Sequence, residues 1–308
     1  MVTIASIATW AILLGVNKQI LHESQISPWL YTFIEHAFGG LLFMLIAWRP
    51  SQSFAAAWRA ATWAYGALRV LSAASLTAAL AYVSVFEATL MGMISLPIAA
   101  IVAYRLNQER LSWRETLAHG VIVVSALALS PIAGGEQAHK AFLLILLSEL
   151  CVVGSVFISE RHPDNKPGDF VQKMWFTGIA LTTTSVVLAG AGLIEGRINA
   201  DARESGAQAA PAMWAAAAAA AVGVGLRGPA VLLSFWSVRL VGAANYILAT
   251  TLLPIFGFAF EALLNRFDLS PPLAINASAY PIALVMLGAI LVVGLERRRT
   301  ARSSARVT

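Results

Sequence analysis

The stretch Leu106-Asn107-Gln108-Glu109-Arg110-Leu111-Ser112 ends a pattern that returns 158 positions later (106 to 264) as Leu264-Asn265-Arg266-Phe267-Asp268-Leu269-Ser270. In both copies an arginine inside an apolar run, Arg69 or Arg227, stands 38 residues before the asparagine (69 to 107 and 227 to 265). A Pro-Ile pair lies between them, at Pro97 in one copy and at Pro254 in the other. A repeat of this size in an apolar chain is typical of membrane proteins that are built from two related halves.

The composition indicates a chain that lies in a lipid bilayer. Hydrophobic residues make up 58% of it and charged residues only 12%, about half the charged fraction of a soluble domain. The single cysteine, Cys151, lies in an apolar run, so we expect no disulfide framework and no thiol metal site. No other metal and no cofactor is expected either. The first residues lack a basic region and a cleavage site, so the first apolar segment is expected to be retained. The net charge of +5 gathers at the C-terminus and indicates topology rather than a nucleic-acid partner.

Ten apolar segments approach the length of about 20 residues that a membrane-spanning helix needs. They cover 3–21, 28–48, 63–82, 86–104, 116–132, 139–159, 170–194, 220–240, 243–263 and 277–295. The predicted fold class is therefore an all-α integral membrane protein with ten transmembrane helices, arranged as two inverted five-helix repeats. We expect the first repeat at 1–135, the second at 136–296 and a basic cytoplasmic tail at 297–308.

The orientation follows from the Lys and Arg residues in alternate loops. With the N-terminus inside, 14 of the 21 fall in inner loops and 5 in outer loops, while Arg69 and Arg227 fall within spans. Both termini are therefore expected in the cytoplasm, with the chain in the inner (plasma) membrane. Because each half has an odd number of spans, the halves must have opposite orientations, which is typical of carriers that work by alternating access.

Several short motifs recur in a fixed order. They are Ala81-Tyr82, Leu96-Pro97-Ile98, Glu109-Arg110-Leu111-Ser112 and Gly120 in the first half, and Leu253-Pro254-Ile255 and Gly288 in the second. Together they resemble the EamA-type branch of the drug/metabolite transporter superfamily over essentially the whole chain. The resemblance implies a ten-span transporter without a shared catalytic set. Two departures stand out: Trp10 is followed by alanine where the family often has glycine, and Asp268 lacks the Glu-Arg pair.

Arg69 and Arg227 are the first candidate site residues, because a charge at the bilayer centre costs roughly 2.5–3.5 kcal/mol and needs a partner or a wet cavity. Arg69 lies about six residues into its span, roughly 9 Å deep at 1.5 Å per residue. A helix that starts near Met213 would put Arg227 past the midpoint, whereas the repeat register puts it roughly 9 Å from the outer face. We prefer the repeat register, which predicts two gates at opposite ends of a shared cavity. The alternative for Arg69 is a side chain that snorkels to the interface.

Glu35 and His36 form a second group of candidates, seven and eight residues after Pro28. This spacing places them roughly 10 Å below the outer face, where Arg227 is the natural partner of Glu35. A static ion pair that holds two helices together is one interpretation. The other is a gate pair that opens during transport.

Glu149, in the middle of the sixth span, has the most costly position in the chain. It is the first candidate for a group that carries a coupling proton or contacts a cation. The alternative is a protonated carboxyl bonded to a neighbouring helix. Trp175, one turn inside the seventh span, is a further cavity candidate, whereas Trp10 is expected at an interface with most other tryptophans. Glu261 is expected at a solvated helix end.

These features favour a secondary transporter that moves a small polar metabolite, such as an amino acid or a related carboxylate, outward. Arg69 and Arg227 would meet the carboxylate, and Glu35 or Glu149 would meet an amine or carry a proton. The alternative is a proton-coupled exporter of lipophilic cations. An enzyme is not expected, because the five histidines are scattered and no Gly-rich phosphate loop occurs. The expected partners are the lipid bilayer, the small-molecule substrate and a coupling proton, and the chain is expected as a monomer or homodimer.

Overall fold

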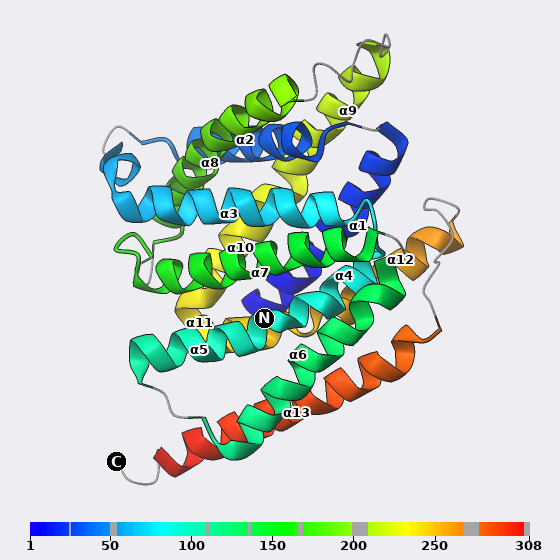
Figure 1. Cartoon of the computed structure of the whole chain (residues 1–308). Helices are drawn as coiled ribbons and strands as arrows, with labels where there is room; N and C mark the ends of the chain where they lie inside the picture. Colours follow the sequence, from blue (N-terminus) through cyan, green and yellow to red (C-terminus); the bar gives the residue numbers. More distant parts are fainter. Residues whose placement is uncertain are drawn as a thin grey trace.

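The computed structural model of the protein describes residues 1–24, 26–49, 54–108, 111–134, 137–165, 169–198, 209–267 and 277–304. All secondary structure within these ranges is helical, as the sequence predicts (Figure 1). The helices are α1 (Val2–Ser24), α2 (Pro28–Ala47), α3 (Ala60–Ala79), α4 (Val85–Met91), α5 (Ser95–Asn107), α6 (Trp113–Gly134), α7 (Ala138–Arg161), α8 (Phe170–Ile198), α9 (Ala209–Val222), α10 (Gly228–Val241), α11 (Ala243–Thr250), α12 (Leu253–Arg266) and α13 (Ala279–Ser304). Shorter elements are the 3-10 helices η1 (Phe54–Trp58) and η2 (Gly92–Ile94) and the π-helical turn η5 (Gly223–Arg227). Glu109, Arg110, Asp268 and the end of the predicted tail lie outside the described residues.

Eight helical segments of the described residues are long and apolar enough to cross a membrane. They are Val2–Ser24, Pro28–Ala47, Val85–Leu106, Trp113–Ile132, His139–Arg161, Met213–Val241, Ala243–Arg266 and Ala279–Arg299. The other two predicted spans, 63–82 and 170–194, correspond to α3 and α8, which are helices but do not belong to this group. α3 carries Arg69 and several hydroxyl side chains, which lower its apolar character. The count of ten spans and the inverted orientation of the repeats therefore remain predictions.

Three of the eight segments are interrupted. α4 and α5 are joined through η2, α9 and α10 through η5, and α11 and α12 through a turn at Thr251 and Leu252. The repeated Pro-Ile pair marks two of these breaks, with Pro97 in the first turn of α5 and Pro254 in the first turn of α12. Proline suits this position because the first N–H groups of a helix have no intrahelical partner. Interrupted helices at membrane depth are tolerated where protein or a cavity surrounds them.

Helices from the two halves of the chain alternate in one bundle. α2 packs along α8, α3 along α7 and α6 along α13, and α1 contacts both α10 and α12 (Figure 1). Small residues permit this approach: a Cβ atom added to Gly40 on α2 would lie 2.9 Å from the carbonyl oxygen of Gly178 on α8. The centre of the bundle is therefore enclosed by helices from both halves.

Candidate functional site

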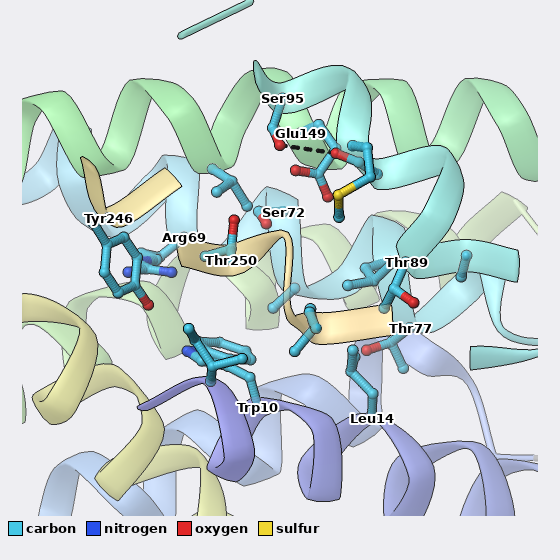
Figure 2. A pocket seen from close by; sticks show the side chains of 18 of the residues that line it. Trp10, Leu14, Arg69, Ser72, Thr77, Thr89, Ser95, Glu149, Tyr246 and Thr250 are labelled. Carbon is cyan, nitrogen blue, oxygen red and sulfur yellow. Dashed lines mark hydrogen bonds between the residues drawn. The ribbon is translucent and has the colours of Figure 1, made fainter. Parts of the chain in front are cut away.

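A cavity lies in the middle of the bundle, among α1, α3, α4, α7, η5 and α11 (Figure 2). Its volume is about 80 Å³. Apolar side chains provide most of its wall. Its hydroxyl groups come from Ser72, Thr77, Thr89, Ser95, Tyr246 and Thr250, and its charged groups from Arg69, Glu149 and Arg227.

Arg69 is a buried cation in the wall of this cavity. Its side chain comes from the middle of α3, and the residue is only 6% exposed. Among the described residues no carboxylate lies within ion-pair distance of it, and its Nε and Nη2 atoms have no hydrogen-bond partner. Its guanidinium carbon lies 5.7 Å from the ring centroid of Trp10 and 5.6 Å from that of Tyr65. Aromatic faces offset part of the cost of burying the cation, and an anion in the cavity would offset the rest.

Arg227 is neutralised by Glu35. Its Nη2 atom donates to Glu35 Oε2 at 2.7 Å, and the two side chains are 1% and 0% exposed. The pair predicted from the sequence is thus present. Gly223 makes it possible, because a Cβ atom there would lie 2.2 Å from the carbonyl oxygen of Glu35 and would push α2 away from η5. Desolvation offsets much of the attraction in a buried pair, so its net contribution to stability is small while the loss of one partner is costly.

The prediction that the two arginines form gates at opposite ends of the cavity is wrong. The guanidinium carbon of Arg227 lies 5.3 Å from the same Trp10 ring that Arg69 approaches. The repeat register placed Arg227 near the outer face, but its helical segment begins at Met213 and passes through a π-helical turn before α10. Arg227 therefore lies about 21 Å along its segment at 1.5 Å per residue, near the middle.

Trp10 lies inside the bundle and not at a membrane interface, contrary to expectation. It lines the cavity, and its Nε1 atom donates to Ser234 Oγ at 2.7 Å. The sequence repeat does indicate that Trp10 lines the cavity. The shift of 139 residues that aligns Gly15 with Gly154 also aligns Trp10 with Glu149 (10 to 149), and both line the cavity.

Glu149 reaches the cavity from α7 and meets the break between α4 and α5. Its carboxyl group forms a hydrogen bond with the hydroxyl of Ser95 (Figure 2). Gly92 makes room for it, since a Cβ atom on Gly92 would lie 3.0 Å from Glu149 Oε1. Arg69 and Glu149 thus line one cavity without forming an ion pair with each other.

The remaining two candidates lie elsewhere. His36 is 1% exposed, and its Nδ1 atom lies 2.7 Å from the carbonyl oxygen of Thr32, so Nδ1 carries the proton of that bond. Trp175 does not line this cavity. It is fully buried in an aromatic cluster, with ring centroids 5.0 Å from Phe54 and 5.7 Å from Trp48. Its position one turn inside α8 faces the neighbouring helices, which the sequence does not distinguish from a cavity.

Sequence reasoning missed Ser6, Ser234 and Tyr246, whose hydroxyl groups meet beside Trp10. Serine and tyrosine are common in helices, and nothing in their spacing singles them out. Among the described residues no group of three or more His, Cys, Asp or Glu side chains could hold a metal ion.

Comparison with known proteins supports the resemblance seen in the motifs. Residues 1–130 match the family model described as "EamA-like transporter family". Over these residues the chain is similar to that family. A solved structure named "Crystal structure of protein" is similar to this chain over 96% of the chain's length and 97% of its own, with a TM-score of 0.60 and 18% identity. That likeness shows a common fold. No curated protein matches the chain.

Proposed function

We propose that this EamA-like protein is a secondary active transporter that exports a small polar metabolite, such as an amino acid or a related carboxylate. The observation that carries the proposal is Arg69, a buried cation in the cavity wall with no carboxylate partner among the described residues. A buried charge of this kind is retained where it serves a ligand, because its desolvation is costly.

The substrate is held at two points. Arg69 binds the carboxylate, since a guanidinium group presents paired N–H donors that match carboxylate oxygens. Glu149, at another part of the same wall, meets the amine or carries the coupling proton. Arg227 is less suited to a second anion, because Glu35 already occupies its Nη2 atom.

Alternating access is supported by the repeat in the sequence and by the equivalent breaks at Pro97 and Pro254. In this proposal ten spans lie in the inner (plasma) membrane in two inverted repeats, with both termini in the cytoplasm. We propose that one chain supplies the whole transport pathway and acts as a monomer or within a homodimer.

A proton-coupled exporter of lipophilic cations is the second candidate. Glu149 and the aromatic face of Trp10 favour it, since both attract cations. The unpaired Arg69 opposes it, because two like charges would share one cavity. The carboxylate proposal is therefore preferred.

Untargeted metabolomics of cells with and without the protein tests the proposal. We expect a carboxylate-bearing metabolite to accumulate outside cells that express the wild type and to fall to the background level with Arg69→Gln. Arg239→Gln is the matched control, because Arg239 lies at the exposed end of α10. Export that survives Arg69→Gln would overturn the carboxylate assignment.

Glu149→Gln then separates the two candidates. Loss of proton dependence with retained export assigns Glu149 to coupling, whereas loss of export assigns it to the amine. If only lipophilic cations are exported, and Glu149→Gln abolishes their export, the second candidate replaces the first.

A further inference from the structure

A buried cluster of hydroxyl groups lies next to Trp10, on the side of α10 and α11. Its members are Ser6 on α1, Ser234 on α10 and Tyr246 on α11, which we call the hydroxyl cluster. Their relative exposures are 0%, 0% and 2%. Tyr246 Oη lies 2.7 Å from Ser234 Oγ, and Ser6 Oγ lies 3.1 Å from each of the other two oxygens. The cluster thus joins the first and second halves of the chain.

The protons of the hydroxyl cluster have one consistent arrangement. Ser234 donates its only proton to the carbonyl oxygen of Ala230 at 2.7 Å. The indole Nε1 of Trp10 can only donate, so Ser234 Oγ accepts from it at 2.7 Å. Tyr246 donates to the remaining lone pair of Ser234, which leaves Ser6 to donate to Tyr246. Ser234 therefore uses its full capacity of one donor and two acceptors, and a fully satisfied buried network fixes the orientation of its members.

The network orients the Trp10 indole, which lines the proposed substrate site. The Trp10 ring lies 5.7 Å from the guanidinium carbon of Arg69 and 5.3 Å from that of Arg227. Figure 2 shows Trp10, Arg69 and Tyr246 around one part of the cavity. Attraction between a cation and a ring depends on the position of the ring face, so rotation of the indole would remove this contact from both arginines.

We propose that Ser234 is a positioning residue of the substrate site. Ser234 does not line the cavity itself; it holds the Trp10 indole by one hydrogen bond and the Tyr246 ring by another. Through Trp10 it keeps the guanidinium group of Arg69 ready to receive a carboxylate. This inference rests on the proposed function for its link to carboxylate binding, while the orientation of Trp10 can be measured without any substrate.

The experiment uses the full chain in nanodiscs with ¹⁵N-labelled tryptophan, and acetate as the simplest carboxylate probe. Trp10→Phe assigns the indole N–H signal of Trp10. In Ser234→Ala we expect that signal to move upfield as the hydrogen bond is lost, and the dissociation constant for acetate to rise about tenfold. Ser234→Thr keeps a hydroxyl group and should restore both values toward those of the wild type.

Ser237→Ala is the matched control. Ser237 lies one turn further along α10 and is fully buried, but its hydroxyl has no hydrogen-bond partner among the described residues. We expect neither the Trp10 signal nor acetate binding to change in it. If Ser234→Ala does not fold, Tyr246→Phe takes its place. That variant removes one donor to Ser234 and should weaken acetate binding several-fold.

The outcomes separate this inference from the proposed function. A Trp10 signal that does not move in Ser234→Ala, or acetate binding that stays unchanged while the signal moves, overturns the positioning role. Wild-type protein that binds acetate no better than Arg69→Gln overturns the carboxylate site instead, and the Trp10 signal still decides whether Ser234 orients the indole.

Discussion

Glu35 Oε2 lies 2.7 Å from Nη2 of Arg227, with both side chains shielded from solvent. Because of this pair, the two arginines of the cavity differ in whether a carboxylate neutralises them. Arg227 is balanced by its own carboxylate, whereas Arg69 has no carboxylate partner among the described residues. Of the two arginines that the sequence repeat supplies, Arg69 is thus the one without a carboxylate partner in the described part of the chain.

Removal of one partner of this pair should destabilise the protein. Glu35→Gln leaves a buried guanidinium group without its counter-charge, which costs about 3–5 kcal/mol. The double variant Glu35→Gln with Arg227→Met should recover much of that loss, because no charge is left unpaired. Thermal unfolding of the purified protein in detergent measures the cycle. Additive losses in the double variant would contradict the pairing.

Alanine at Gly223 should separate α2 from η5. The added Cβ atom would lie 2.2 Å from the carbonyl oxygen of Glu35, so backbone must move at a cost of about 1–3 kcal/mol or more. Gly225→Ala is the control two residues later, where no atom lies within 4 Å of the added Cβ. Melting temperatures should fall for the first variant only. Equal effects of the two substitutions would show that the close contact is unimportant.

Alanine at Gly92 should disturb transport more than stability. Its Cβ atom would lie 3.0 Å from Glu149 Oε1, and the flexible carboxyl group can turn away from the break between α4 and α5. We expect the rate of metabolite export to fall several-fold. Gly120→Ala on α6 is the control, since its Cβ atom meets open space. Normal export by Gly92→Ala would mean that the position of Glu149 is not critical.

Glu261 should be a stabilising residue and not part of a solvated surface. It is 5% exposed, contrary to expectation, and it accepts from the backbone N–H groups of Val85 and Phe86 at 3.0 and 3.2 Å. It also pairs with Lys18 at 3.1 Å. Glu261→Ala leaves the first N–H groups of α4 without partners and should cost about 2 kcal/mol or more in unfolding free energy. Glu23→Ala, at an exposed site on α1, should change little.

Acid should destabilise the protein through His162, which lies after the end of α7. Its Nδ1 atom accepts from the backbone N–H of Asp164 at 3.2 Å, and Nε2 lies 3.1 Å from Thr62 Oγ1. Burial lowers the pKa of His162 from its usual value of 6.5, so the unfolded chain binds its proton at a higher pH than the folded protein does. The stability that neutral His162 contributes is therefore fully present above pH 6.5, and it is lost as the pH falls below that value.

Melting temperatures between pH 5 and pH 7.5 test this linkage. His162→Gln should flatten the pH dependence relative to the wild type, whereas His22→Gln, at an exposed site on α1, should keep it. An unaltered pH dependence in His162→Gln would assign the effect to other groups.

The sequence could predict the pairing of Glu35 with Arg227, because a cation in one apolar segment favours a carboxylate partner in a neighbouring one. It could also predict eight of the helical segments from apolar length. It could not predict that Arg69 and Arg227 meet on Trp10. The expected depth of Arg227 assumed a regular helix in the repeat register. In the structure the helical segment begins at Met213 and contains the π-helical turn η5, so Arg227 lies deeper along it. Glu261 was missed for another reason: its partners are 243 and 176 residues away in the chain.

Trp10 and Glu149, which the 139-residue shift aligns, make the two counterpart positions of the cavity wall chemically different. Two identical halves would place the same residue at both positions, and a molecule between them could turn end over end without any difference in energy. Here an aromatic ring that carries two guanidinium groups stands at one position and a carboxyl group at its counterpart. A ligand with two unlike ends would thus bind in one orientation. In the proposed transporter, this difference between the two positions would decide which end of the substrate faces which side of the cavity.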